Sequence, residues 1–250
     1  MDLNKVSIPA DYNDFNGQMA DYSCESSGKY EIYFRNLEDA IIRHIDQASY
    51  VYGCVAWLTN FKILNALQNT KNVGIVVQKE DFLRPDTSFN SKSGKDWKTD
   101  LRKAYTSLPG SNRQLGDKDD IRHAWHQIDE LSDHKLDAGL RKISYLNFSH
   151  SWDWQPVRCM GNYNREKNPA FPRMHNKFLI FCNEKHTPYG VWTGSCNLSE
   201  NSNKSLENAI YLEGKEAVWA YFNEFQQIFA LSEPLDWEQD WCQPEFRIGT

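Results

Sequence analysis

Apolar residues recur at two different spacings between residues 30 and 77, and this pattern predicts alternating helices and strands. Positions three or four residues apart predict two helices, with apolar faces made by Leu37, Ile41, Ile45 and Ala48 and by Phe61, Leu64 and Leu67. Continuous apolar runs at 50–58 and 73–77 predict two buried strands. Asn36 is placed to cap the first helix. This strand–helix–strand order favours parallel pairing, with the helix packed on a face of the sheet.

The pattern resumes in the second half of the chain. Apolar runs predict four more strands, at 157–162, 178–181, 190–193 and 208–212, and aromatic residues at helical spacing predict a final helix over 215–231. A polar stretch at 183–188 is interpreted as a hairpin loop. Together the elements predict an α/β fold, with a mixed, largely parallel β-sheet flanked by helices on both faces.

Two segments depart from the α/β pattern. Residues 1–28 are polar and turn-rich and are interpreted as an N-terminal arm, which leaves 29–250 as one domain. Within that domain, 84–145 is charged and is interpreted as a helical insertion, which either packs on the domain or clamps a substrate. Its two apolar stripes are Trp97, Leu101, Tyr105 and Leu108, then Ile121, Trp125, Ile128 and Leu131.

Composition indicates a large domain in a reducing compartment. Of 250 residues, 40% are hydrophobic, which is enough for a sizeable core. No apolar run approaches the roughly 18 residues that span a bilayer, and Met1 is not followed by a signal-peptide pattern, so we expect a cytoplasmic protein without stable membrane association. The 6 cysteines include no Cys-x-x-Cys pair, which favours buried reduced thiols. A net charge of −6 argues against a protein that coats nucleic acid, but it permits a local basic groove.

Polar residues suited to phosphodiester chemistry stand at the ends of three predicted strands. His175 and Lys177 precede the 178–181 strand, Ser195 and Asn197 follow the 190–193 strand, and Glu207 precedes the 208–212 strand. An imidazole can attack phosphorus, while a lysine and neutral donors can stabilise charge on the phosphate oxygens. Glu207 can hold the imidazole in one tautomer. Side chains carried on strand ends can form a rigid site.

The His-x-Lys element and the later Gly194-Ser195-Cys196-Asn197 together resemble the signature of the phospholipase D superfamily. The resemblance implies a phospholipase D-like fold and a metal-independent phosphodiesterase with a phosphohistidine intermediate at His175 and no cofactor. Two features depart from the family pattern. Cys182 stands where the family usually has Asp, and the stretch from Cys182 to Gly194 is longer than usual.

The chain contains a single His-x-Lys element, although the reaction requires a second group to protonate the leaving oxygen. Single-copy members of the superfamily dimerise, so the resemblance implies a homodimer in which His175 of each subunit reaches one site.

The substrate is left open between nucleic acid and lipid. A nuclease is favoured, because cations that could flank a phosphate backbone and aromatic residues that could stack on bases precede the motif. They are Arg158, Arg165, Lys167, Arg173, Tyr163 and Phe171. A phospholipase would need an exposed interfacial surface. An inactive module that binds nucleic acid or phosphate would keep the same pocket, whereas metal-dependent hydrolysis is disfavoured because His, Asp and Glu do not cluster at ligand spacing.

Overall fold

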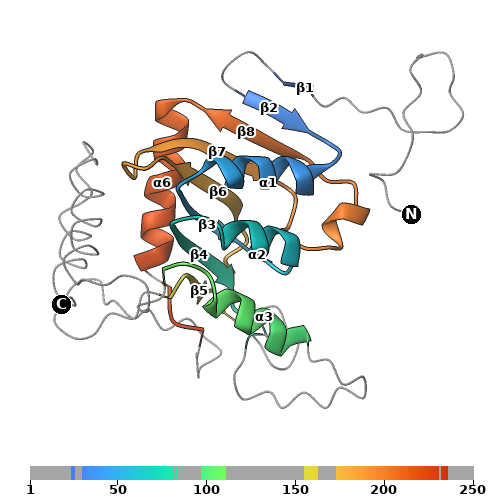
Figure 1. The fold of residues 1–250 in the computed structure, drawn as a ribbon, viewed down its shortest axis with the longest axis vertical. Helices are drawn as coiled ribbons and strands as arrows, with labels where there is room; N and C mark the ends of the chain where they lie inside the picture. The colour runs from blue at the N-terminus through green and yellow to red at the C-terminus, as the bar shows by residue number, and fades with distance from the viewer. Residues whose placement is uncertain are drawn as a thin grey trace, which may run out of the picture.

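An eight-stranded β-sheet runs through the part of the chain that the computed structural model describes (Figure 1). The described residues are 24–25, 30–80, 83, 97–110, 155–162, 173–230 and 232–235. The strands are β1 (Cys24–Glu25), β2 (Tyr30–Tyr33), β3 (Tyr50–Val55), β4 (Asn72–Gln78), β5 (Val157–Met160), β6 (Lys177–Cys182), β7 (Pro188–Gly194) and β8 (Ala209–Glu213). Their order across the sheet is β1-β2-β8-β7-β6-β3-β4-β5, so the two halves of the chain are interleaved.

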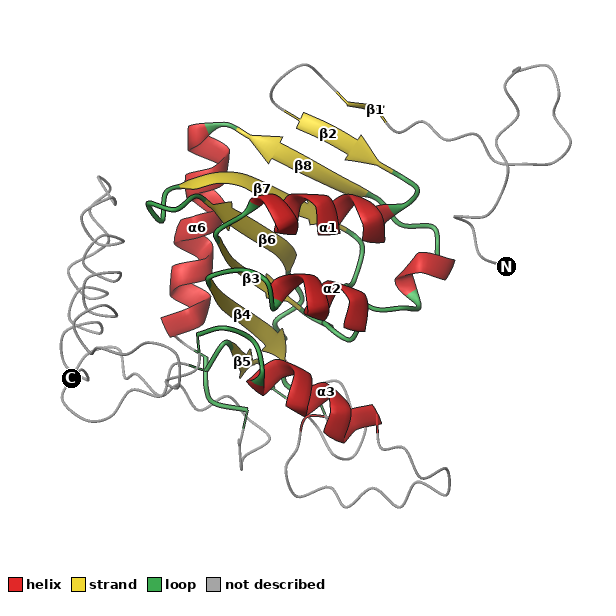
Figure 2. Ribbon diagram, in the orientation of Figure 1, coloured by secondary structure: helices red, strands yellow, loops and turns green. Residues whose placement is uncertain are grey.

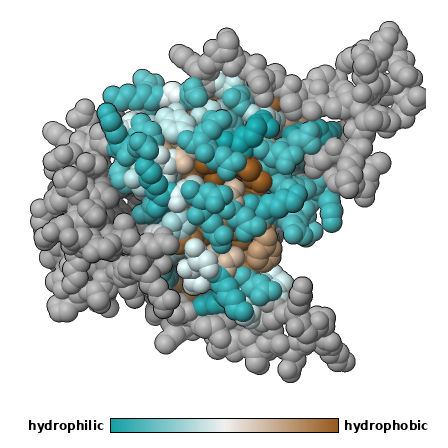
Figure 3. Space-filling view, viewed as in Figure 1, coloured by the Kyte–Doolittle hydropathy of each residue, from teal (hydrophilic) through white to brown (hydrophobic). Residues whose placement is uncertain are grey.

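Helices cover both faces of this sheet (Figure 2). They are α1 (Leu37–Gln47), α2 (Phe61–Leu67), α3 (Trp97–Thr106) and α6 (Lys215–Ala230), with a short 3-10 helix at Ser202–Lys204. The first three lie on one face and α6 lies on the other (Figure 1). On the face that carries α1 and α2, the described residues at the surface are mostly hydrophilic (Figure 3).

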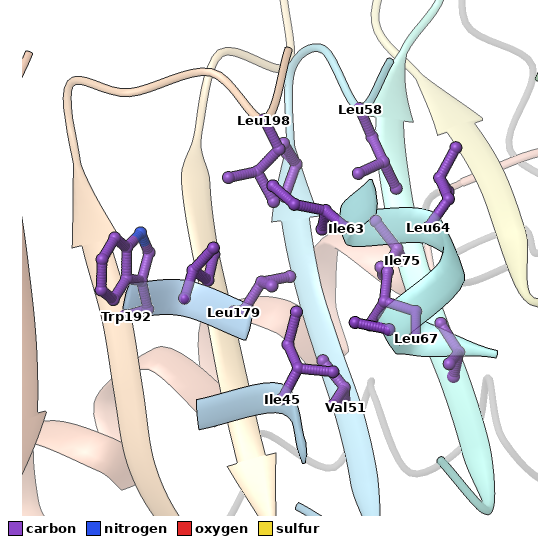
Figure 4. Packing of buried hydrophobic residues seen from close by; sticks show 14 of the residues in the cluster. Ile45, Val51, Leu58, Ile63, Leu64, Leu67, Ile75, Leu179, Trp192 and Leu198 are labelled. Carbon is purple, nitrogen blue, oxygen red and sulfur yellow. The ribbon is translucent and has the colours of Figure 1, made fainter. Parts of the chain in front are cut away.

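The central strands β3, β4 and β6 are largely apolar because both of their faces are buried. In β6, Leu179 and Phe181 belong to the core beneath α1, α2 and α3, whereas Phe178 and Ile180 belong to the core against α6. Figure 4 shows the first of these cores, where side chains of α1 and α2 lie over the sheet. A strand covered on two sides needs apolar residues at every position, which explains the continuous runs in the sequence.

The predicted strands and helices are confirmed in the described part of the chain, and so are the mixed sheet and its helices on both faces. The expectation of a largely parallel sheet is wrong. Among the described strands only β3–β4 and β4–β5 pair in parallel, and the other five pairings are antiparallel. The reason is that short connections join β6 to β7, and that β2 adds to the sheet antiparallel to β8.

The N-cap of α1 also differs from the expectation. Asn36 stands at the N-cap position, but its backbone is left-handed, with φ of 52°, and its side chain makes no capping hydrogen bond. The conventional cap belongs to α2, where Asn60 accepts hydrogen bonds from the backbone N–H of Lys62 at 2.9 Å and of Ile63 at 3.3 Å.

Part of the predicted insertion packs into the fold. Leu101 and Tyr105 of α3 are buried, and the Tyr105 hydroxyl donates to the carbonyl oxygen of Leu58 at 2.5 Å. The second predicted stripe, over 121–131, lies outside the described residues. The same is true of the arm over 1–28, except for Cys24–Glu25, which pair with β2. Four of the cysteines are buried free thiols as predicted, namely Cys54, Cys159, Cys182 and Cys196.

Candidate active site

Five of the predicted site residues gather at one end of the sheet. The antiparallel pairing of β6, β7 and β8 brings the start of β6, the end of β7 and the start of β8 to the same edge. Lys177 opens β6 opposite Val55, and Gly194 ends β7 opposite Ala209. His175, Ser195, Asn197 and Glu207 lie in the connections that enter or leave these strands.

Residues 173–176, which we call the histidine segment, cross the ends of three strands before entering β6. Arg173 bridges Gly161 just after β5. The backbone N–H of Met174 donates to Gln78 Oε1 at the end of β4, at 2.6 Å. The carbonyl oxygen of Asn176 accepts from the N–H of Ala56, just after β3, at 2.8 Å. The segment that carries His175 is therefore attached to the sheet on both sides of the histidine.

The side chains of His175 and Lys177 lie against each other. Lys177 Nζ is 3.2 Å from Nδ1 and 3.3 Å from Nε2 of His175, and it donates to the His175 carbonyl oxygen at 3.0 Å. These near-equal distances single out neither ring nitrogen. The imidazole is exposed, so the histidine and the ammonium can meet an incoming anion together.

The surroundings of His175 lower the pKa of its imidazole. Its pKa is lowered, first by partial burial and then by the positive charges of Lys177 and Arg173. Burial also lowers the pKa of Lys177, while the negative charge of Glu207 opposes this shift. Because a neutral imidazole has a lone pair to give, the lowered pKa of His175 favours the nucleophilic form near neutral pH.

Ser195 is held by the residues that precede β8. Its N–H donates to the Asn208 carbonyl oxygen at 3.1 Å, and its Oγ accepts from the Asn208 N–H at 3.1 Å and from Nδ2 at 3.4 Å. The Ser195 hydroxyl donates its proton to Glu207 Oε2. Glu207 thus contacts Ser195 and forms no hydrogen bond with His175 in the structure, which differs from the expected role of fixing the imidazole. Asn208, the first residue of the predicted 208–212 strand, completes this cluster.

Asn197 lies in a loop that is attached to the β3–α2 connection. The carbonyl oxygen of Leu198 accepts from the N–H of Thr59 at 2.8 Å and of Asn60 at 3.0 Å, and Leu198 packs near Leu58 (Figure 4). The Oδ1 atom of Asn197 is buried and has no hydrogen-bond partner among the described residues.

The four predicted substrate-binding cations have different environments. Arg173 is exposed and lies two residues from His175, as a phosphate contact requires. Arg158 is only 6% exposed, and its guanidinium donates to Ser232 Oγ at 2.7 Å and to the Ser232 carbonyl oxygen at 3.0 Å. The prediction for Arg158 is therefore wrong, because its donors hold residue 232 against β5. Arg165 and Lys167 lie outside the described residues.

Cys182 lies far from the reacting groups. It ends β6 opposite Tyr50, five residues beyond Lys177 and at the other end of the strand. It is fully buried, and burial raises the pKa of its thiol. The departure from the family pattern therefore leaves the contacts of His175 and Lys177 intact.

One exposed side chain next to the site was not predicted. Trp57 follows Ala56, the residue that bonds Asn176, and is 41% exposed. Its indole Nε1 donates to Glu80 Oε1 at 3.2 Å, which fixes the ring beyond the ends of β3 and β4. The signal in the sequence was a large aromatic residue at the end of an apolar run, which is more often a core residue.

Neither a metal-binding cluster nor a membrane-spanning helix occurs among the described residues. No group of three or more His, Cys, Asp or Glu side chains there could hold a metal ion. None of the described helices is long and apolar enough to cross a membrane.

Comparison with known proteins places the chain in a family. No family model matches it. Uncharacterized protein L381 of Acanthamoeba polyphaga mimivirus is 34% identical over 240 residues, which cover 95% of this chain and 75% of that protein. The chain belongs to the same family as this mimivirus protein.

Three solved structures are similar to the chain at low sequence identity. NucT from Helicobacter pylori has a TM-score of 0.45 and 12% identity, covering 82% of this chain and 98% of that one. The phospholipase D family member Nuc from Salmonella typhimurium has a TM-score of 0.44 and 13% identity, covering 82% and 95%. Phosphatidylserine synthase from Haemophilus influenzae has a TM-score of 0.38 and 11% identity, covering 88% and 43%.

Proposed function

We propose that this protein is a metal-independent phosphodiesterase of the phospholipase D superfamily, that it cleaves nucleic acid, and that it works as a homodimer. The observation that carries the proposal is the contact of Lys177 Nζ with the exposed imidazole of His175, at 3.2 and 3.3 Å from its ring nitrogens. The pairing places a nucleophile and a cation where one phosphate group can meet both.

In the first step, a ring nitrogen of neutral His175 attacks phosphorus, and a P–N bond forms as the bond to the leaving oxygen breaks. Lys177 stabilises the charge on the other phosphate oxygens. Asn197 supplies a neutral donor, and Ser195 can do so once the substrate replaces Glu207 as the acceptor of its proton. Lys177 leaves the imidazole for the phosphate as the nitrogen attacks.

The leaving oxygen requires a proton, and the described part of one chain offers no second histidine at this end of the sheet. His44 is a buried residue of α1, and His186 lies in the β6–β7 hairpin at the opposite end. We assign the acid to His175 of the partner subunit, which gives its proton to the leaving oxygen. Water then attacks the phosphohistidine and returns a proton to that partner imidazole, which restores both histidines.

Nucleic acid is the substrate that the surroundings of the site favour. Trp57 offers an exposed ring within one residue of the contact between Ala56 and Asn176, and bases stack on such rings. Arg173 and Lys177 supply positive charge for the phosphate backbone.

The test is cleavage in excess EDTA by the wild type, by His175→Asn and by His186→Asn as a matched control. Substrates are single- and double-stranded DNA, RNA, and vesicles of an anionic phospholipid. We expect cleavage of nucleic acid by the wild type and the control, with a loss of about a thousandfold or more in His175→Asn, because removing a nucleophile abolishes the covalent route.

Other outcomes would redirect the assignment. Cleavage of lipid alone would make the protein a phospholipase. Binding of nucleic acid without cleavage by the wild type would make it an inactive binding module. Full activity of His175→Asn would remove His175 as the nucleophile.

A further inference from the structure

The side chain of His175 makes few contacts that could hold the imidazole ring in place. Its imidazole is exposed, and the only described contacts of the ring are with Lys177. The orientation of the ring therefore depends on the backbone of the histidine segment. A displacement of about 1 Å can cost a hundredfold in rate, so whatever fixes this backbone also sets the reactivity of the histidine.

The carboxamide of Gln78 fixes the backbone immediately before His175. Gln78 is 3% exposed, and its Oε1 accepts from the N–H of Met174 at 2.6 Å. Its Nε2 donates to the carbonyl oxygens of Lys79 at 3.0 Å and Asn162 at 3.1 Å. One buried side chain thus joins the end of β4, the residues that follow β5 and the histidine segment, with its hydrogen-bonding capacity largely satisfied.

Gly161 makes room for this arrangement. Its φ is +99°, and a Cβ at this position would lie 2.4 Å from Gln78 Oε1 and 2.9 Å from the Met174 nitrogen. These two atoms form the hydrogen bond that holds the segment. Any larger residue would therefore push into that bond as well as strain its own backbone.

We propose that Gln78 and Gly161 form a clamp that positions His175 for attack on phosphorus, an inference that rests on the proposed function. Gln78 is a positioning residue, since it touches the backbone next to the nucleophile and not the reacting atoms. The clamp lies at the reacting end of the sheet, whereas Cys182, in place of the family's Asp, is buried at the other end. In this chain the end of β4 contributes directly to the support of the histidine segment.

The experiment compares Gln78→Met and Gly161→Ala with Gly214→Ala. Methionine matches the length of glutamine but cannot accept from Met174. Gly214 is the matched glycine control, because its φ is +140° and a Cβ there would meet nothing within 4 Å. For each variant we would measure kcat and KM on a single-stranded oligonucleotide, thermal stability, and the titration of the His175 imidazole by NMR.

We expect Gln78→Met and Gly161→Ala to lower kcat by about 10- to 100-fold while KM changes by less than about threefold. The midpoint of the His175 titration should rise towards the ordinary histidine value, because the ring is no longer held beside Lys177 and Arg173. Gln78→Glu should lie nearer to the wild type at about pH 6, where a buried, protonated carboxyl still offers one acceptor and one donor.

The proposal that the clamp positions His175 is wrong if Gln78→Met and Gly161→Ala give the same kcat and the same His175 titration as Gly214→Ala. The two proposals fail separately. If the wild type cuts nothing, the NMR titration still decides whether the clamp holds His175. If the wild type cuts and the clamp variants cut equally well, the clamp fails and the proposed function stands.

Discussion

At the scale of the residue, the chemistry of this protein depends on which polar groups the fold already uses. The donors of Arg158 are taken by Ser232, and the carboxamide of Gln78 is taken by three backbone groups. Lys177 and His175 contact each other at the surface, where a phosphate can displace one from the other. The residues left to meet a substrate are therefore fewer than the charged residues near the motif.

Two exposed tryptophans provide a matched test of base stacking. Trp57 is 41% exposed beside the site, and Trp97 is 48% exposed on α3. We expect Trp57→Ala to raise KM for single-stranded substrates about 5- to 30-fold, because a stacked base contributes about 1–3 kcal/mol.

Trp97→Ala should change this KM by less than about twofold, because a surface substitution away from the site usually has an effect within about 0.5 kcal/mol. Steady-state cleavage of one labelled oligonucleotide gives both values. Equal effects of the two substitutions, or none from Trp57→Ala, would show that the ring beside the site does not bind a base.

The candidate site could be predicted at this scale only in part. His175 and Lys177 followed from residue type and order, because few pairs can attack phosphorus and stabilise its oxygens at once. The role of Arg158 could not be predicted from residue type and order. It alternates with Val157 and Cys159 in β5 and faces the ring of Phe229 at 5.5 Å, a contact that depends on where α6 packs. Nothing in the sequence indicated a role for Gln78, because its two partners in other segments, Asn162 and Met174, are backbone groups far along the chain.

At the scale of the element, apolar runs in the sequence predicted where the strands lie. The directions of the strands could not be predicted in this way, because they depend on the connections between strands. The β3–α2–β4 unit was predicted correctly as parallel. The error was to extend that unit to the whole sheet, since β6, β7 and β8 follow one another in antiparallel order. Length and composition reveal a buried strand, but which distant strand lies beside it depends on packing over the whole sheet.

The two N-cap asparagines should respond differently to substitution. Asn60 is buried, caps α2 and also donates from Nδ2 to Glu38 Oε2 at 2.5 Å. We expect Asn60→Ala to lower the free energy of unfolding by about 1–3 kcal/mol, through the lost cap and an unpaired buried N–H.

Asn36→Gly should stay within about 0.5 kcal/mol of the wild type, because glycine adopts a φ of 52° without strain. Urea denaturation measured for both proteins tests the pair. A larger loss from Asn36→Gly than from Asn60→Ala would contradict the capping roles assigned here.

At the scale of the whole molecule, one chain carries half of the proposed machinery. The sheet end presents a nucleophile, a cation and neutral donors, and the acid is assigned to a second copy. An isologous interface places the same residue of each subunit near the symmetry axis. Activity should therefore belong to pairs of chains.

Mixing subunits tests this directly. When wild type and His175→Asn are unfolded together, refolded and assayed, activity should follow about the square of the wild-type fraction, because only pairs with two intact histidines turn over. His186→Asn in place of His175→Asn should leave activity proportional to total protein. A linear dependence on the wild-type fraction, or a monomeric mass at concentrations that give full specific activity, would contradict the shared site.

The interleaved strand order also affects when a growing chain can become active. β2 pairs with β8, so a strand that is synthesised early can complete its pairing only after a strand that is synthesised much later. Lys79, fully buried beside the clamp, pairs with Glu233, which is synthesised later than every strand of the sheet. Closure of the sheet beside Gln78 is therefore more favourable once Glu233 is present, because the buried lysine then has this carboxylate as a partner. The site proposed here would thus be completed only after most of the sheet has been synthesised, because β6, β7 and β8 carry its residues and β2 must pair with β8.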